Sequence, residues 1–160
     1  MKNRFYNKDE WGTPKYFYNK LYEEFDFDFD PCPLRFEDNN FDGLVCEWGS
    51  SNYINPPYDR KLKPLFVKKA LAESRKGKIC VLLLPVSTST KLFHEVIQPN
   101  ASEIRFLKGR LPFIGINSKG EYVNWHLENL SNIKPPANVN HVKANGQQDL
   151  MIVIFDGKNI

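Results

Sequence analysis

An uninterrupted apolar run, Ile79-Cys80-Val81-Leu82-Leu83-Leu84-Pro85, constrains the fold of this chain more than any other feature. The run has strand length and no polar alternation, which is typical of a strand buried on both faces of a sheet. Strand and helix patterns alternate along the chain, and this order predicts an α/β sheet with helices on its faces. Leu150 to Phe155 is a second strong strand pattern.

Three further segments carry apolar residues at helical spacing. Thr13 is expected to be the N-cap of the first helix, with Pro14 at the first helical position, where its missing N–H costs nothing. Gly77 is expected to end the second helix. The predicted helices are residues 14–24, 62–75 and 89–97.

Residues 25–30 read FDFDFD and predict a strand. Strict alternation would turn Phe27 and Phe29 inward and Asp26 and Asp28 outward. The prolines at 31 and 33 prevent a central strand from continuing, so Asp30 is expected at its carboxyl end. Shorter strands are predicted over 44–48, 52–54 and 104–107, a turn over 109–113 leads into another extended piece, and 117–149 is predicted to be a long mobile loop or a hairpin excursion.

The chain has 160 residues, of which 41% are apolar, so it can bury one core and is expected to be a single domain over residues 1–160. No window approaches the roughly 20 apolar residues of a membrane helix, and the first residues lack the apolar run of a signal peptide. We therefore expect a cytoplasmic protein with no membrane partner. Cys32, Cys46 and Cys80 have no metal-ligand spacing and are expected to be reduced thiols, with no metal bound.

The net charge of +3 is unevenly distributed. Residues 9–47 contain eleven acidic side chains, whereas residues 59–78 contain eight basic and two acidic ones. A basic surface here would suit a polyanion, since phosphate contacts supply most non-specific nucleic-acid affinity. The alternative is that these lysines are only the solvated face of an amphipathic helix.

Residues 55–58 read NPPY and directly follow a predicted strand. The Asn55 side-chain oxygen and the Pro56 carbonyl are two acceptors, and the proline nitrogens bring no competing donor. A planar primary amine fits such a pair, and Tyr58 could stack on a flat base. Because ligands collect at the carboxyl ends of strands, Asp30, Asn55 and the segment 85–87 are expected to border one cleft. The alternative is a stiff turn without chemistry.

NPPY resembles the (D/N/S)-P-P-(Y/F) motif of S-adenosylmethionine-dependent methyltransferases that modify exocyclic amino groups. The wider chain resembles the phage-type DNA adenine-N6 methyltransferases. The matching segments are Asp9-Glu10-Trp11, Thr13-Pro14, Asp30-Pro31-Cys32, Asp42-Gly43-Leu44, Trp48, NPPY itself, Leu83-Leu84-Pro85, Phe93-His94 and residues 108–113.

This resemblance implies a minimal Rossmann-like methyltransferase sheet with a C-terminal β-hairpin. Only 25 residues separate Asp30 from Asn55, and a parallel crossover takes a dozen or more. The region of the second and third strands is therefore expected to be trimmed.

The resemblance also implies the reaction: direct methyl transfer from S-adenosylmethionine to the exocyclic amino group of an adenine flipped out of double-stranded DNA, without a metal. The protein would be phage- or prophage-encoded and act in a bacterial host. The catalytic residues would be Asn55, Pro56, Pro57 and Tyr58; the cofactor-binding residues Trp11, Thr13, Pro14, Asp30, Pro31 and Cys32; and the DNA-binding residues Arg60, Lys61, Lys108 and Arg110.

One segment departs from most methyltransferases of that fold, which have a glycine-rich loop after the first strand. Residues 30–34 contain no glycine, whereas the phage-like group tolerates a D-x-C turn there. Two alternatives stay open at this point. One is methylation of an RNA guanine or a protein glutamine, and the other is a nucleic-acid-binding module that has lost catalysis.

Overall fold

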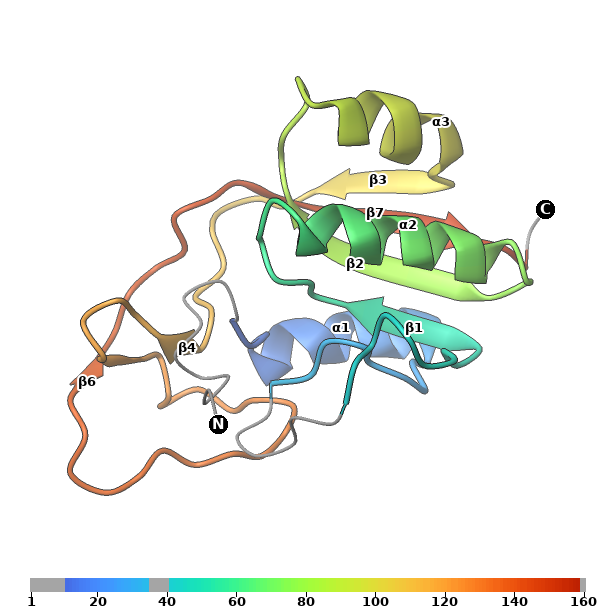
Figure 1. Ribbon diagram of the computed structural model, residues 1–160. Coiled ribbons are helices and arrows are strands. Elements are labelled where there is room, and N and C mark those ends of the chain that lie inside the picture. The colour runs from blue at the N-terminus through green and yellow to red at the C-terminus, as the bar shows by residue number, and fades with distance from the viewer. Residues whose placement is uncertain (1–10, 35–40, 159–160) are drawn as a thin grey trace.

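The computed structural model describes residues 11–34 and 41–158, which form a mixed α/β fold built on two sheets (Figure 1). The larger sheet has the strand order β1-β2-β7-β3. β1 and β2 are parallel, while β7 is antiparallel to both of its neighbours, β2 and β3. The bounds of these strands are β1 Ser51–Ile54, β2 Ile79–Pro85, β3 Glu103–Phe106 and β7 Leu150–Asp156.

β2 and β7 form the centre of this sheet and pair along their whole length, from Ile79 opposite Asp156 to Pro85 opposite Leu150. Nearly every residue of both strands is buried. This confirms the prediction from the continuous apolar runs, because only strands covered on both faces dispense with polar alternation.

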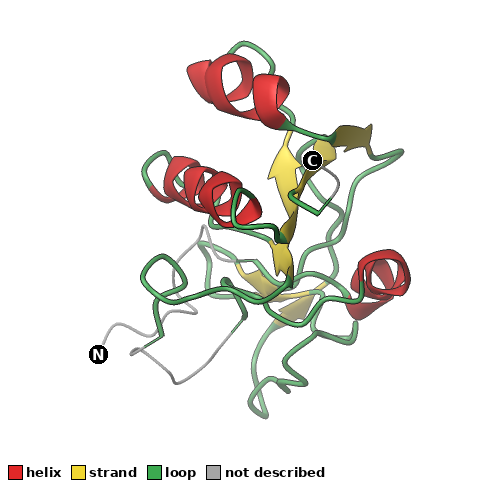
Figure 2. Ribbon diagram, turned by 90° about the vertical axis from the view of Figure 1, so that its right-hand side faces the viewer, coloured by secondary structure: helices red, strands yellow, loops and turns green. Residues whose placement is uncertain are grey.

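Helices cover both faces of the larger sheet. α1, Lys15–Phe25, lies on one face, and α2, Leu62–Ser74, lies on the other, as the edge-on view of Figure 2 shows. A π-helical stretch η2, Leu92–Ile97, continues into a short α3, Gln98–Asn100, on the same face as α2. The three predicted helices are confirmed, and Gly77 follows the second with a left-handed φ of 89°.

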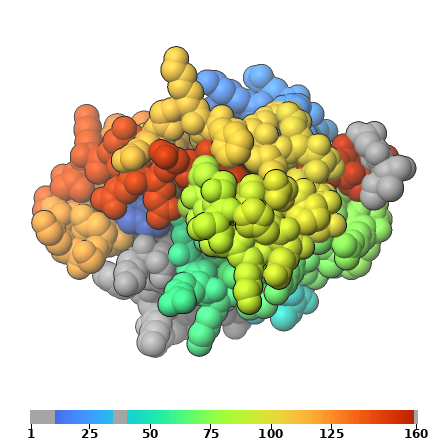
Figure 3. All heavy atoms as spheres, turned by 90° about the horizontal axis from the view of Figure 1, so that it is seen from above, coloured from blue at the N-terminus to red at the C-terminus, as the bar shows by residue number. Residues whose placement is uncertain are grey.

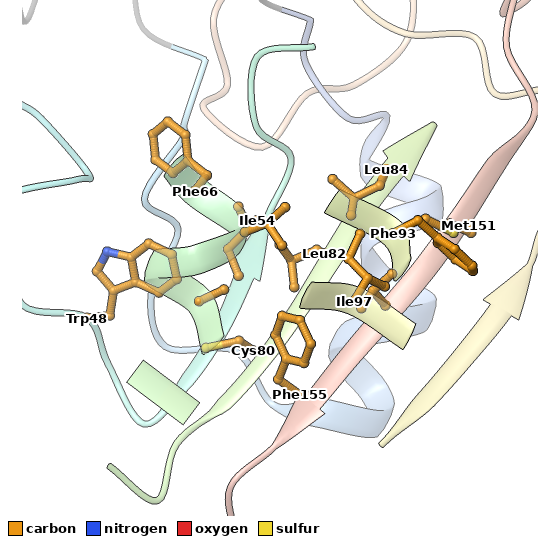
Figure 4. Packing of buried hydrophobic residues seen from close by; sticks show 13 residues of the cluster. Trp48, Ile54, Phe66, Cys80, Leu82, Leu84, Phe93, Ile97, Met151 and Phe155 are labelled. Atoms are coloured by element: carbon orange, nitrogen blue, oxygen red, sulfur yellow. The ribbon is translucent and has the colours of Figure 1, made fainter. Parts of the chain in front are cut away.

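Two apolar clusters hold these layers together. On the α2 side, β2 and β7 contribute Leu82, Leu84 and Phe155, which pack against Phe66 of α2 and Phe93 of η2 (Figure 4). On the α1 side, the alternate residues of the same strands pack against α1. That second cluster contains Leu21, Phe27, Tyr53, Val81, Leu83, Leu111, Leu150, Ile152 and Ile154.

The first helix begins differently from the prediction. Pro14 is extended and forms the N-cap, so α1 starts at Lys15, and no side chain caps it. Thr13 is not the cap, because its hydroxyl is hydrogen-bonded to the Tyr53 hydroxyl at 2.6 Å. The Thr13 hydroxyl, which the local pattern predicted to cap the helix, bonds instead to a residue forty positions away in the chain.

The FDFDFD segment is not a regular strand. Its one ladder contact is an isolated parallel bridge between Phe29 and Asn52. The chain leaves α1 through Asp26 in a left-handed conformation, φ 49°, and without a continuous ladder the pleat does not set the side chains. Phe27 therefore packs on the α1 side and Phe29 on the α2 side, although Asp26 and Asp28 are exposed as predicted.

The predicted strand at 44–48 is a turn and loop. Trp48 is buried there and donates its indole N–H to the Gly43 carbonyl at 2.7 Å. The apolar residues at 44–48 thus belong to a turn, with the Trp48 ring packed beneath it.

The segment 117–149 is not a loop throughout. β5, Tyr122–Val123, pairs antiparallel with β4, Gly115–Ile116, and parallel with β6, His141–Val142. Ile114, Ile116, Tyr122 and Trp125 form a buried cluster of their own. This small sheet forms one end of the molecule, coloured orange in Figure 3. The C-terminal strand β7 pairs antiparallel with β3, but 107–149 separates them, so they are not a tight hairpin.

Within 11–34 and 41–158, no helix is long and apolar enough to cross a membrane. Among the described residues, none of Cys32, Cys46 and Cys80 forms a disulfide. Burial raises the pKa of Cys80 to about 12, so this thiol stays protonated.

A buried carboxylate accounts for much of the basic run after NPPY. Glu73 on α2 is 1% exposed and forms ion pairs with Lys69, Lys76 and Lys78 at 3.0, 3.1 and 2.7 Å. Lys78 also donates to the Trp48 carbonyl at 2.7 Å. The primary role of these three lysines is therefore to neutralise Glu73 and stabilise the packing of α2.

We expect stability to depend on pH through Glu73. Burial would raise its pKa, but hydrogen bonds from Lys78, Lys69 and Lys76 outweigh burial and lower the pKa from 4.5 to about 2. Because the pKa is lower in the folded protein, the Glu73 carboxylate adds about 3 kcal/mol to the free energy of unfolding. This contribution is fully present above pH 4.5 and is lost as the pH falls toward 2. Glu73→Gln should lose this amount at pH 7 and little at pH 2 in urea unfolding. A pH-independent difference between the two proteins would contradict this assignment.

Candidate functional site

The NPPY segment follows β1 directly and ends at Tyr58, with three residues between it and α2. Asn55, Pro56 and Pro57 are buried and have no regular secondary structure, and Tyr58 is partly exposed. The next residue, Asp59, accepts hydrogen bonds from the backbone N–H groups of Lys61 and Leu62 at 2.7 and 2.8 Å, which lower the pKa of its carboxyl group. The carboxylate thus satisfies the open N–H group of Leu62, the first residue of α2, and so fixes the exit of the motif.

The Asn55 amide has a defined orientation. Its Nδ2 donates to the Trp11 backbone carbonyl at 2.7 Å. Because a carbonyl can only accept, the amino end of the amide must face Trp11, and Oδ1 points elsewhere. Among the described residues, Oδ1 accepts no hydrogen bond, so it is available as an acceptor for a ligand.

Residues 11–13 lie against the end of β1 and against the small sheet. Gly12 exchanges two backbone hydrogen bonds with Ile114, at 2.6 and 3.0 Å. Thr13 bonds to Tyr53 on the other side. The segment thus joins the small sheet to the strand that carries the motif.

A first pocket, which we call the Asp30 pocket, brings together distant parts of the chain. Asp30 and Cys32 form one wall, and the Asp30 carboxylate accepts the Cys32 backbone N–H at 2.8 Å. The volume is only about 10 Å³, close to the minimum that holds one water molecule. The lining residues are Trp11, Gly12, Thr13, Asp30, Cys32, Leu34, Asn55, Asn129 and Leu130.

Two of the predicted cofactor residues do not line this pocket. Pro14 forms an isolated bridge with Asn129. Pro31 is buried against Gly43, whose missing side chain leaves room for the Pro31 carbonyl. Both prolines shape the backbone beside the pocket, while Trp11, Thr13, Asp30 and Cys32 face it.

A second pocket, which we call the Tyr58 pocket, lies at the carboxyl end of β2. Its volume is about 380 Å³, and its lining residues are Tyr58, Lys63, Pro85, Val86, Ser87, Gln148 and Asp149. Tyr58 donates its hydroxyl to the Leu83 carbonyl at 3.1 Å, and its ring packs edge-on against Phe113 at 6.1 Å. Burial raises the pKa of Tyr58, so the phenol stays neutral.

The prediction of one cleft bordered by Asp30, Asn55 and the segment 85–87 is wrong. Asp30 and Asn55 line the first pocket, and 85–87 lines the second. The NPPY segment itself connects them, because its first residue faces the Asp30 pocket and its last faces the Tyr58 pocket. The segment that follows β1 thus lines two pockets, whereas the sequence predicted a single cleft.

The four predicted DNA-binding residues are all exposed. Arg60 and Lys61 follow Asp59 and directly precede α2, whose N-cap is Lys61. Arg110 pairs with Asp149 of the Tyr58 pocket at 3.6 Å, and Lys108 lies two residues earlier. Lys63, which was not among the predicted site residues, lines the same pocket, and burial lowers its pKa.

Several residues at the two pockets carry no local signal in the sequence. Asn129 and Leu130 come from a segment that was predicted to be a loop, and Gln148 and Asp149 directly precede β7. Tyr53 lines neither pocket but bonds to Thr13 of the Asp30 pocket, and in the sequence it looked like an ordinary strand residue. The only hint in the sequence was that Gln148 and Asp149 directly precede the apolar run of β7. The start of β7 lies beside the carboxyl end of β2, because these two strands are antiparallel.

Residues 11–34 and 41–158 contain no group of three or more histidine, cysteine, aspartate or glutamate side chains that could hold a metal ion. His126 and His141 line a separate hollow of about 280 Å³ beside the small sheet, with Trp125, Val142 and Lys143. Of the segments that carried the family resemblance, Asp9 and Glu10 lie outside the described residues.

Comparison with known proteins identifies the family. Residues 2–133 match the family model described as DNA N-6-adenine-methyltransferase (Dam). A curated relative, the DNA N-6-adenine-methyltransferase of Haemophilus phage HP1 (strain HP1c1), is 35% identical over 127 residues, which covers 72% of this chain and 71% of the relative. No solved structure matches the chain. With its NPPY segment set between two pockets, the chain therefore belongs to the DNA N-6-adenine-methyltransferase (Dam) family.

Proposed function

We propose that this protein transfers a methyl group from S-adenosylmethionine to the exocyclic N6 amino group of adenine in double-stranded DNA. The orientation of the Asn55 amide is the observation that carries the proposal. Its amino end is held by Trp11, which leaves the oxygen to accept from the target amine. Membership of the family supports adenine over the RNA and protein acceptors.

The motif would bind the amine through two acceptors. Asn55 Oδ1 and the Pro56 carbonyl would each accept one N–H of the adenine amino group, and the prolines offer no competing N–H donor. Drawing both hydrogens into the plane of the acceptors leaves the nitrogen lone pair directed at an electrophile. The buried, proline-stiffened backbone keeps this pair of acceptors fixed before the substrate arrives.

The Asp30 pocket would hold the cofactor. Its donor set suits S-adenosylmethionine, because a carboxylate can accept from hydroxyl and ammonium groups while Trp11, Leu34 and Leu130 offer apolar and aromatic surface. When bound, the cofactor supplies an electrophilic methyl group. At about 10 Å³ the pocket would have to widen to admit a molecule of that size. Thr13 and Cys32 would complete the wall next to Asp30.

The Tyr58 pocket would receive the adenine. Its volume of about 380 Å³ falls in the usual range for ligand pockets, roughly 300 to 1,000 Å³. A base inside a duplex cannot reach Asn55, so the nucleotide must be flipped out of the stack. The Tyr58 ring is anchored by its hydroxyl at Leu83, which would hold a flat surface against the base.

The larger sheet supports a minimal Rossmann-like methyltransferase fold. Phe29 bridges to Asn52 of β1, and β1-β2-β7-β3 follow with β7 antiparallel between its neighbours. No strand is described between Phe29 and β1 within 27–34 and 41–50, in keeping with a trimmed second and third strand. We propose one methyltransferase domain that is phage- or prophage-encoded and acts in the cytoplasm of a bacterial host.

Replacing the amide should stop catalysis without loss of the cofactor. We expect Asn55→Ala to lower kcat by about 100-fold or more, because one acceptor for the amine is lost. Calorimetry should give an S-adenosylmethionine Kd within about threefold of the wild type, since this substitution removes no charge from the Asp30 pocket. A wild-type methylation rate in this variant would refute the role of Asn55.

Cofactor affinity should depend on Asp30. We expect Asp30→Ala to weaken binding about 10- to 100-fold, the usual loss for a hydrogen bond to a charged group. Asp26→Asn is a matched control, because it removes a charge from an exposed residue four positions away. Equal affinities of Asp30→Ala and the wild type would contradict the cofactor assignment. Absence of binding by the wild type would favour a nucleic-acid-binding module without catalysis.

DNA affinity should depend on the basic residues after the motif. We expect Arg60→Ala/Lys61→Ala to reduce the slope of log K against log salt by about 1.8, or 0.9 per phosphate contact. Lys68→Ala/Arg75→Ala removes the same charge from exposed positions farther along the chain and should change the slope little. Equal slopes for the two double variants in a titration of labelled duplex would place the DNA elsewhere.

A further inference from the structure

We infer that the hydroxyl pair of Thr13 and Tyr53 positions Asn55 for catalysis, an inference that rests on the proposed methyl transfer and deepens it. The two hydroxyl oxygens are 2.6 Å apart. Thr13 is 3% exposed and Tyr53 is fully buried. Neither residue would be a catalytic group, and each would act through the backbone it holds in place.

The register of two contacts supports this role. Thr13 faces Tyr53, and two residues away on each segment the Trp11 carbonyl faces the Asn55 amide. The segment 11–13 therefore runs antiparallel to the end of β1 and is tied to it at two points. One hydrogen bond would let the segment pivot about Asn55, whereas two fix where the Trp11 carbonyl lies.

The other side of the segment is held by the small sheet. Gly12 pairs with Ile114 through two backbone hydrogen bonds. The Trp11 ring lies where a side chain on Gly115 would be, since a Cβ there would come within 2.6 Å of the ring. These contacts set the segment against the small sheet, and the Thr13–Tyr53 pair sets it against the motif strand.

Breaking the Thr13–Tyr53 hydrogen bond is expected to change the position of the Asn55 amide. Removing one hydroxyl leaves the other buried without its partner, which favours a shift of the segment. A displacement of about 1 Å in a positioning contact can lower the rate by up to about 100-fold. Tyr53 lines neither pocket, so its variant changes the position of Asn55 without touching cofactor or base.

The test is a double-mutant cycle on kcat, measured on adenine-containing duplex at saturating cofactor. Tyr53→Phe and Thr13→Val should each lower kcat about tenfold, and the double variant should lose no more than either single one, because both remove the same bond. Thr13→Ser keeps the hydroxyl and should restore kcat to within about twofold of the wild type. The S-adenosylmethionine Kd of Tyr53→Phe should stay within about twofold.

Glu73→Gln serves as the control for stability, because it weakens the packing of α2 and contacts neither the motif nor residues 11–13. Its kcat per folded molecule should equal that of the wild type. Single-variant losses that multiply in the double variant, a wild-type kcat in Tyr53→Phe, or an equal loss in Glu73→Gln would each overturn the inference. A wild-type protein that methylates no DNA would instead refute the proposed function.

Discussion

The burial of β2 and β7 between two helical layers is the constraint on which the other features depend. These strands pair over their whole length and expose almost no side chain. β1 is held parallel to β2, and α2 returns the chain across the covered face. The NPPY segment therefore leaves the sheet from a strand that pairs with β2 along its whole length, which fixes where the motif begins.

Local patterns predicted the parts of the fold that local physics decides. The apolar runs of β2 and β7 and the helical spacing of α1 and α2 were read correctly, because period and burial are set within each element. The errors arose where a distant residue intervened. Thr13 bonds to Tyr53 in place of capping α1, Trp48 packs under a turn, and the segment after Ile116 folds against its own apolar cluster.

The candidate site divides in the same way. Asn55 and Tyr58 were predicted from the chemistry of their neighbours in the chain, and in the structure they line different pockets. Asn129 and Gln148 could not be found, since their positions depend on how the small sheet and β7 return to the motif. The basic run was also only partly informative, because Glu73 holds three of its lysines. The ion pairs of Glu73 therefore separate Lys69, Lys76 and Lys78 from the other basic residues of this stretch.

In the proposed reaction, the amide oxygen of Asn55 accepts a hydrogen bond from the N6 amino group of adenine. The most direct test incubates duplex DNA with the protein and methyl-labelled S-adenosylmethionine, then digests the DNA to nucleosides and identifies the labelled one. We expect label in N6-methyladenine alone, and none when Asn55→Ala replaces the wild type. Label in a cytosine derivative, in RNA guanine or in protein, or unchanged labelling by the variant, would contradict the proposed reaction.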